Sequence, residues 1–236
     1  MINARPVAAA VATAVMASLL TLVGSVAPAT AATSYDTRVV LTMSSTPGTE
    51  SFTFYPQAEV FADAAPASYY HADGRMQLQR RDAGSLVWQT VATGSANNFD
   101  PKPEWFLTNY TGNATYRVYF EGGVDGFGSG TTWKPSYSNE VSVQVYRHDV
   151  GVPHNRGARA WIEGTLTNWA HQRVLVQQKR CRACAWHVYA RPRTDSAGHY
   201  KLRVATSRKG LHYRVTAKAT AQFLKTRSPV LQARIL

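Results

Sequence analysis

The fold is decided by a repeated stretch, which reads Leu78-Gln-Arg-Arg-Asp-Ala-Gly-Ser-Leu-Val-Trp-Gln-Thr-Val-Ala92 in its first copy and Val176-Gln-Gln-Lys-Arg-Cys-Arg-Ala-Cys-Ala-Trp-His-Val-Tyr-Ala190 in its second. The two copies align without a gap. Each is followed by a Tyr-Arg-Val segment, at Tyr116–Val118 and at Tyr213–Val215. A repeat spaced by roughly 100 residues indicates two tandem domains, because solenoid repeats are only about 20 to 50 residues long.

Apolar and polar residues alternate in the segments around the repeat. One face is shared by Tyr200, Leu202 and Val204, another by Trp186 and Val188, and a third by Tyr213, Val215 and Ala217. A period of two is typical of half-buried strands, and the segment Asp195–Gly198 supplies a turn between two of them. Short alternating strands separated by turns predict an all-β chain of two tandem antiparallel immunoglobulin-like β-sandwich domains, with almost no helix.

The composition agrees with a folded β-protein. Apolar residues make up 44% of the chain, which excludes disorder throughout. Aromatic residues reach 11%, and these favour strands.

The first residues have the order of a secretory signal peptide. Arg5 gives a positive start, Val7–Val23 is apolar, and Ala29–Ala31 is a small-residue cleavage site. The alternative is an uncleaved membrane anchor, because the apolar run is nearly long enough to span a bilayer. Cleavage before Ala32 predicts a secreted, extracellular protein, associated with the cell wall or free, with no transmembrane segment in the mature chain.

The predicted organisation has four parts. Residues 1–31 are the signal peptide, and residues 32–147 form the first immunoglobulin-like sandwich. Residues 148–157 form a linker, in which Gly151, Pro153 and Gly157 break regular structure. Residues 158–236 form the second, basic sandwich.

The motifs of the second copy resemble the immunoglobulin-like or fibronectin-III-like repeats of secreted actinobacterial proteins. They are Val176-Gln177 followed by Trp186 and Ala190, then Thr194-Asp-Ser-Ala-Gly-His-Tyr200, then Tyr213–Val215. The first copy matches this pattern in 78–92 and 116–118 but lacks the Thr-Asp-x-x-Gly-x-Tyr turn. The resemblance implies a spacer, adhesion module or appendage of a cell-envelope protein, and it assigns no reaction.

Two pairs of aromatic residues occupy equivalent places in the copies. We expect Trp88 and Trp186 to be core residues that anchor the packing. We expect Tyr116 and Tyr213 to be strand residues whose hydroxyl groups fasten a corner of each sandwich.

Positive charge is concentrated in the second half. The chain has 26 Lys and Arg residues and a net charge of +12, and residues 148–236 hold 17 of these cations but only three of the 14 acidic residues. This asymmetry predicts an acidic partner, namely anionic cell-wall or extracellular polymers; the alternative is a basic surface that only aids solubility. Alternation places Lys201, Arg203 and Arg214 opposite apolar neighbours, which predicts one positive sheet face. The candidate polyanion-binding residues are Lys179, Arg180, Arg182, Arg191, Arg193, Lys201, Arg203, Arg214 and Lys218.

A glycine-rich segment at 122–130 is the candidate ligand loop of the first domain. It lacks the Lys-Ser/Thr of a phosphate-binding loop. Phe127, Trp133 and Tyr137 lie in or beside it, and their rings would stack on a carbohydrate or contact a protein ligand. The alternative is a mobile loop whose aromatic residues cap the end of the sandwich.

The cysteines Cys181 and Cys184 form the only pair in the chain. An even count in an exported protein predicts a disulfide, in the loop of the hairpin before Trp186. A redox motif would need a helix at the pair, which the sequence does not predict. A zinc site would use both thiolates and His187, with His171 or His154 as the fourth ligand. We expect the disulfide and no metal.

No catalytic constellation is evident. The sequence has no G-x-S-x-G or H-E-x-x-H motif, and Asp149, Glu163 and Asp195 are the only acidic residues after position 147. No nucleic-acid-binding motif is present either. The sequence predicts a non-enzymatic binding or structural protein without cofactors, without specificity for nucleic acid, and with no catalytic residues.

Overall fold

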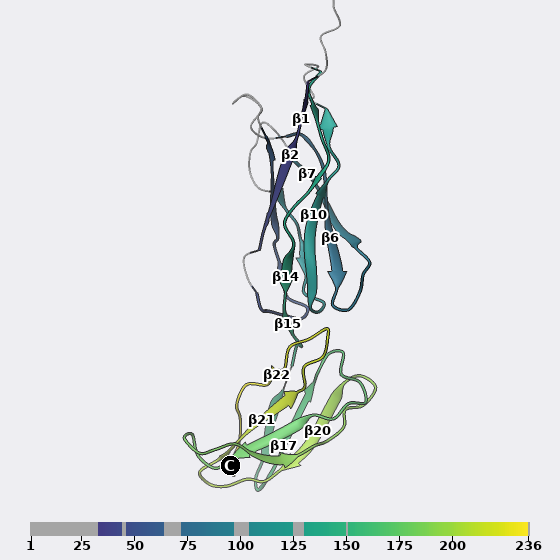
Figure 1. Ribbon diagram of the computed structural model, residues 1–236. Helices are drawn as coiled ribbons and strands as arrows, with labels where there is room; N and C mark the ends of the chain where they lie inside the picture. The colour runs from purple at the N-terminus through teal and green to yellow at the C-terminus, as the bar shows by residue number, and fades with distance from the viewer. Residues whose placement is uncertain are drawn as a thin grey trace, which may run out of the picture. The chain divides into compact units, whose positions relative to one another are not determined.

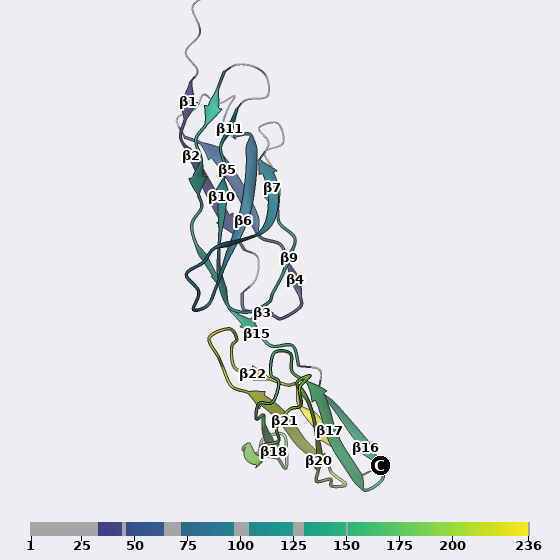
Figure 2. The same cartoon turned by 90° about the vertical axis from the view of Figure 1, so that its right-hand side faces the viewer.

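The computed structural model describes residues 33–43, 46–63, 72–96, 104–124, 130–149 and 151–235, which form strands and turns without an α-helix. The sheets make two antiparallel sandwiches, each with its own buried cluster of hydrophobic residues, as can be followed in Figure 1 and Figure 2. The chain is therefore all-β, as the sequence predicts. The predicted signal peptide lies outside the described residues.

The first sandwich has two main antiparallel sheets. One has the order β2-β5-β8; the other has the order β13-β10-β6-β7, and β14 also pairs with β10. The strands of the first sheet are β2 (Thr37–Thr42), β5 (Gln57–Ala62) and β8 (Glu104–Trp105). The strands of the second are β6 (Gly74–Asp82), β7 (Gln89–Ala96), β10 (Ala114–Phe120), β13 (Ser136–Tyr137) and β14 (Val141–Val143).

Short strands complete the first sandwich. They are β1 (Ser34–Tyr35), β11 (Gly123–Val124) and β12 (Thr132–Trp133), then β3 (Gly48–Thr49) with β15 (Val145–Tyr146), and β4 (Thr53–Phe54) with β9 (Thr108–Asn109). The core lies between the main sheets because alternate residues of their strands point inward. Tyr116, Val118 and Phe120 of β10 are fully buried and pack with Ala58 and Val60 of β5 in one cluster.

The second sandwich repeats this plan. One sheet has the order β16-β17-β20, and the other has the order β19-β18-β21-β22, with β23 also pairing with β21. The strands of the first sheet are β16 (Val152–Arg156), β17 (Arg159–Thr165) and β20 (His199–Val204). The strands of the second are β18 (Leu175–Lys179), β19 (His187–Ala190), β21 (Leu211–Ala217), β22 (Thr226–Arg227) and β23 (Leu231–Ala233).

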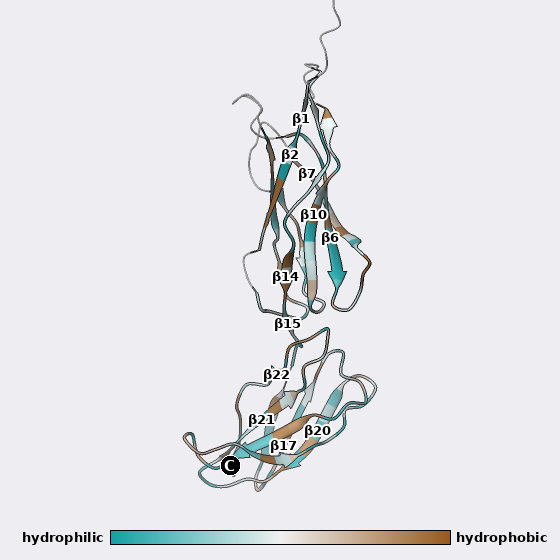
Figure 3. Cartoon of the chain, viewed as in Figure 1, coloured by the Kyte–Doolittle hydropathy of each residue, from teal (hydrophilic) through white to brown (hydrophobic). Residues whose placement is uncertain are grey.

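Burial along these strands follows the predicted period of two. Tyr200 and Val204 of β20 are buried, as are Tyr213, Val215 and Ala217 of β21. Figure 3 shows hydrophilic and hydrophobic segments along the strands of both sandwiches. The positions between the buried ones are therefore left for polar and charged side chains on the outer faces.

One expected element differs. The stretch 148–157 was expected to be a linker, but Val152–Arg156 is the strand β16, which pairs with β17 along its whole length. Its breaker residue Pro153 fits because β16 is an edge strand, where a missing N–H does not interrupt the sheet. The domain boundaries themselves stay a prediction.

The turn expected at Asp195–Gly198 is present. Asp195 Oδ1 accepts hydrogen bonds from the backbone N–H groups of Ala197 and His199, both at 2.9 Å. Gly198 has φ of +78°, and a Cβ atom there would lie 2.2 Å from the carbonyl oxygen of Leu166. Only glycine fits this position, because other residues are strained at positive φ and the neighbouring atom is backbone.

Candidate functional site

The candidate polyanion-binding residues lie on both layers of the second sandwich. Lys201 and Arg203 belong to β20, whereas Lys179 and Arg214 belong to β18 and β21 of the other sheet. The expectation of a single positive sheet face that includes Arg214 is therefore wrong. Alternation correctly directs each side chain away from the core, but β20 and β21 belong to opposite layers, so their outer faces point in opposite directions.

The remaining candidates lie outside the strands. All five are exposed, at the hairpin between β18 and β19 or just after β19 and β21. They are Arg180, Arg182, Arg191, Arg193 and Lys218. Whether they bind a polyanion stays a prediction.

The first outer face, which we call the Trp161 face, is formed by β16, β17 and β20. Trp161 pairs with His154 on one side and with Arg203 on the other, and Glu163 pairs with Lys201. The His154 ring stacks on the indole with centroids 5.1 Å apart and planes at 12°. Lys201 Nζ lies 5.6 Å from the indole centroid.

A shallow depression of about 390 Å³ lies on this face. It is lined by Arg159, Ala160, Trp161, Lys201 and Arg203. Of these residues Ala160 is buried, Trp161 is half-buried, and the three cationic side chains are exposed. The arrangement combines one aromatic ring with several cations, which suits a ligand that has both an anionic group and an apolar surface.

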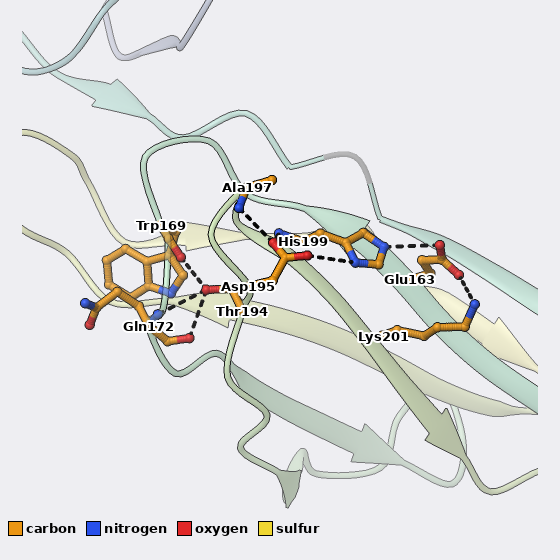
Figure 4. A network of polar contacts seen from close by, with 8 residues as sticks. All are labelled: Glu163, Trp169, Gln172, Thr194, Asp195, Ala197, His199 and Lys201. Carbon is orange, nitrogen blue, oxygen red and sulfur yellow. Dashed lines mark hydrogen bonds and ion pairs between the residues drawn. The ribbon is translucent and has the colours of Figure 1, made fainter.

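Lys201, which lines this depression, is the end of a chain of polar contacts that is drawn in Figure 4. Glu163 Oε2 lies 2.8 Å from Lys201 Nζ, and its Oε1 lies 3.1 Å from His199 Nε2. His199 Nδ1 lies 3.7 Å from Asp195 Oδ2. The hydrogen bond from Lys201, aided by His199, lowers the pKa of Glu163 to about 2, so this carboxylate is ionised and holds Lys201 in place.

Thr194, next to Asp195, fixes the base of the same turn. It is buried, and its hydroxyl group donates to the carbonyl oxygen of Trp169 and accepts a 3.0 Å hydrogen bond from the backbone N–H of Gln172. The turn that positions His199 is thus tied to the neighbouring loop.

The second outer face, which we call the Trp186 face, contains a cation–aromatic cluster. The Arg214 guanidinium lies 4.3 Å from the Trp186 centroid and Lys179 Nζ lies 4.8 Å from it. Arg214 Nε also donates a 2.8 Å hydrogen bond to Gln177 Oε1. Partial desolvation, together with the nearby charge of Arg227, lowers the pKa of Arg214 from its ordinary value.

The same cluster occurs in the first sandwich. Arg117 and Arg81 lie 4.1 Å and 4.6 Å from the Trp88 centroid, and Arg117 Nε donates a 2.9 Å hydrogen bond to Gln79 Oε1. The first half of the chain has no excess of positive charge. This repeated cluster is therefore explained as a structural feature of the repeat and does not require an anionic ligand.

The expectation that Trp88 and Trp186 are core residues is wrong. Both are half-buried on outer faces, where cationic side chains cover their rings. Val188, expected on the same face as Trp186, is 51% exposed. Trp133 and Trp169, by contrast, are buried.

The prediction that Tyr116 and Tyr213 are inward-facing strand residues agrees with the structure better than the prediction for the two tryptophans. Tyr116 and Tyr213 are fully buried, and burial raises the pKa of each to about 12. The hydroxyl group of Tyr213 donates a 2.9 Å hydrogen bond to the carbonyl oxygen of Ala205 and accepts one of 2.6 Å from Gln178 Nε2. Tyr213 therefore fastens the segment between β20 and β21.

The cation excess is not neutralised inside the second sandwich. Of its 17 Lys and Arg residues, which all lie in the described ranges, only Lys201 has a carboxylate within ion-pair distance there. Asp195 is engaged by its turn, and Asp149 accepts a 3.1 Å hydrogen bond from the Tyr200 hydroxyl. Burial raises the pKa of Asp149 to about 6.

The structure contradicts the predicted role of one residue of the candidate ligand loop in the first sandwich. Trp133 is only 3% exposed and packs in the core, with its ring 5.7 Å from Tyr35, so it presents no surface for stacking on a ligand. Tyr137 is 53% exposed and lies 4.7 Å from the Tyr119 ring and 4.2 Å from the Arg117 guanidinium. Phe127 lies outside the described residues.

The two cysteines are joined. The sulfur atoms of Cys181 and Cys184 are 2.16 Å apart, as in a disulfide, so neither thiolate is free for the zinc site considered from the sequence. Within the described ranges, no group of three or more His, Cys, Asp or Glu side chains is placed to hold a metal ion. The same residues contain no apolar helix of membrane-spanning length.

Three residues were missed by the sequence reasoning. Trp161 and Arg159 were not singled out, although alternation in β17 places them opposite the buried Ala160 and Ile162. Arg147 was assigned to the end of the first domain, yet it is only 2% exposed. Its guanidinium donates hydrogen bonds of 3.0 Å to the Lys218 carbonyl oxygen and 2.9 Å to Thr220 Oγ1.

Comparisons with known proteins add a distant likeness. No protein-family model and no curated protein matched the chain. Among solved structures, a segment of two fibronectin type-III domains from chicken tenascin matched with a TM-score of 0.40 and 14% sequence identity, covering 82% of this chain and 97% of that one. The description of the fold rests on the sheets themselves.

Proposed function

We propose that the protein is a secreted, non-enzymatic binding protein whose second sandwich associates with anionic polymers of the cell envelope or its surroundings. The observation that carries the proposal is the uncompensated charge of this sandwich. Its 17 cations face three carboxylates, two of which are held by a turn or by a buried hydroxyl group. Attraction between such a surface and a polyanion follows directly and weakens with salt.

The first sandwich serves as the internal comparison. Several of its exposed cations are already paired with carboxylates, for example Arg38 with Asp63 at 3.8 Å and Lys134 with Asp36 at 2.9 Å. A paired cation contributes little to the attraction of a polyanion, because the neighbouring carboxylate cancels most of its electric field. The proposal therefore assigns binding to the second sandwich alone.

The test is retention of the purified protein on beads that carry a carboxylated polysaccharide, as salt is raised. We expect retention at low salt and release at high salt, and no retention on beads with the uncharged polymer. Two triple variants with equal loss of charge sharpen the result. The first is Arg180→Gln, Arg182→Gln and Arg191→Gln; the control is Arg38→Gln, Arg75→Gln and Lys134→Gln.

Only the first triple variant should elute at lower salt than the unmodified protein. The proposal fails if the protein is not retained, if retention does not depend on salt, or if the control variant loses as much retention as the first. Sequencing the N-terminus of the protein collected outside producing cells tests its export, and we expect a start at Ala32.

The predicted alternative, a carbohydrate- or protein-recognition module in the first sandwich, has one supporting observation. Tyr137 is exposed beside Tyr119 and Arg117 on the outer face of the β13-β10-β6-β7 sheet. Binding that is lost in a Tyr137→Ala variant and persists at high salt would favour it.

A further inference from the structure

We infer that the depression on the Trp161 face is a binding subsite for one acidic sugar unit, a hexuronate, of an anionic polysaccharide. This inference deepens the proposed function and rests on it. It specifies where on the second sandwich the ligand binds and what chemical group is recognised. A positive charge spread evenly over the surface would specify neither.

The Trp161 face is favoured over the Trp186 face by comparison of the two sandwiches. The Trp186 cluster has a counterpart around Trp88, in a half of the chain without excess positive charge. In the corresponding sheet of the first sandwich, the Arg38 guanidinium lies 4.5 Å from the centroid of the Phe61 ring, but Arg38 is paired with Asp63 at 3.8 Å. The Trp161 face differs because, among the described residues, Arg159 and Arg203 have no carboxylate within ion-pair distance.

The geometry of the indole leaves one surface for a ligand. His154 stacks almost parallel on one side of Trp161 and does not line the depression. Arg203, which pairs with Trp161 on the side away from His154, lines the depression together with the indole, and Lys201 Nζ lies 5.6 Å from the indole centroid. A sugar ring laid on this surface buries its C–H groups against the aromatic ring, while its substituents reach the border.

The charges at the border suit a carboxylate. Arg159 and Arg203 are exposed, and within the described residues no carboxylate lies within ion-pair distance of either. A guanidinium pairs with a carboxylate through two parallel hydrogen bonds, which gives both strength and orientation. The charge of Lys201 is partly neutralised by its ion pair with Glu163, so Lys201 attracts a ligand carboxylate less strongly than the two arginines do.

The size of the depression and the convergence of its cations favour a sugar acid over a nucleic acid. At about 390 Å³ it is at the lower end of the range for ligand sites, about 300 to 1,000 Å³. A hexuronate carries its carboxylate on the ring, so a single unit satisfies the indole and an adjacent guanidinium. In a nucleotide the sugar separates base and phosphate, and strand-binding proteins align their cations along a groove.

The test measures the affinity of the purified protein for a short oligogalacturonate by calorimetry at physiological salt. The double variant Arg159→Gln, Arg203→Gln should bind about tenfold more weakly or worse, as expected for the loss of charge-assisted hydrogen bonds. The double variant Arg182→Gln, Arg191→Gln removes the same charge elsewhere and should change the affinity by less than about twofold. The methyl-esterified oligomer should bind far more weakly than the acid.

Two further variants examine the indole and the ion pair. Trp161→Leu should lose binding and Trp161→Phe should keep most of it, since phenylalanine retains an aromatic face. Circular dichroism verifies that both variants are folded. Glu163→Gln should strengthen binding because it releases Lys201, whereas Glu140→Gln, which breaks the 3.0 Å pair with Arg81 in the first sandwich, should not.

The outcomes separate the subsite from the proposed function. If both double variants lose affinity equally, or the short oligomer does not bind while the long polymer is retained on beads, the subsite is wrong and the polymer-binding proposal stands. If the polymer is not retained either, both are wrong. If a single-stranded oligothymidylate binds more tightly than the oligogalacturonate through Arg159 and Arg203, the occupant is a nucleic acid and this inference is overturned.

Discussion

Arg214 lies over the ring of Trp186 while its Nε atom is held by Gln177, and this relationship is repeated by Arg117, Trp88 and Gln79 in the other sandwich. The planar guanidinium stacks on the indole and satisfies a hydrogen bond at the same time. A tryptophan can in this way be kept on an outer face, because its ring is covered by the stems and head groups of charged residues.

The first prediction concerns this relationship. Replacing Arg214 with Ala should lower the free energy of unfolding by about 1–2 kcal/mol, since a cation–aromatic contact and a charge-assisted hydrogen bond are lost. Arg117→Ala should have a similar effect. Denaturant unfolding followed by tryptophan fluorescence measures both, with the exposed Arg191→Ala as the control. A loss at Arg191 equal to that at Arg214 would contradict the structural role of the cluster.

The second prediction concerns pH. An unfolded aspartate has a pKa of about 3.9, and burial raises that of Asp149 to about 6. Between these values the folded state binds more protons than the unfolded one, so the contribution of Asp149 to stability falls as pH rises from about 4 to about 6. Asp149→Asn removes the cost of burying the charge and can still accept the hydrogen bond from Tyr200.

Asp149→Asn should therefore be more stable than the unmodified protein at neutral pH, by at most about 3 kcal/mol, and equally stable below about pH 4. Urea unfolding of both proteins across this range gives the difference. The lowered pKa values of Glu163 and Asp195 act in the opposite direction but are common to both proteins. A variant that is less stable at neutral pH would refute the assignment.

The third prediction concerns Arg147. Its guanidinium donates to Lys218 and Thr220 and lies 4.3 Å from the Trp169 ring and 4.6 Å from the Phe223 ring. Burial lowers its pKa, while the charge of Glu50 acts to raise it.

Arg147→Met should cost about 2–4 kcal/mol, because it removes two side-chain hydrogen bonds and leaves the buried carboxylate of Glu50 without the nearby positive charge. Lys134→Met removes an exposed pair and should cost less than about 1 kcal/mol. Thermal and urea unfolding measure the two variants. Equal losses would mean that Arg147 is no more than a surface charge.

The fourth prediction concerns the disulfide. Replacing Cys181 and Cys184 with Ser together should cost no more than about 2 kcal/mol, since the closed loop is very short, and the β-type circular dichroism spectrum should remain. Thiol titration of the purified protein should find no free thiol before reduction. Two free thiols, or bound zinc by elemental analysis, would contradict the disulfide.

The sequence predicts the strands better than it predicts which side of a strand is buried. Alternation identified β20 and β21 correctly, because their aromatic and aliphatic residues occupy only one of the two faces. The prediction that Trp88 and Trp186 lie in the core was wrong. A tryptophan at the same place in two copies can be a core residue, but it can equally be an outer residue whose ring is covered by other side chains. The cations that cover these rings come from other strands, and their register is not visible in one sequence.

Only part of the candidate site could be predicted, because the pairing of strands is not visible in one sequence. Lys201 and Arg203 were found by alternation within one strand, but their combination with Trp161 and Arg159 requires the pairing of β20 with β17. The assignment of Trp133 to a ligand loop failed because its burial depends on β1, which lies about a hundred residues earlier in the chain.

The most direct test of the central claim is a nuclear magnetic resonance titration of the labelled protein with a short oligogalacturonate, with its methyl ester as the reference. The account predicts that the acid shifts the indole signal of Trp161 and the backbone signals of β17 and β20. The signals of Trp88, Trp186 and the first sandwich should stay unchanged. Shifts confined to the first sandwich, or identical shifts with the acid and the ester, would contradict it.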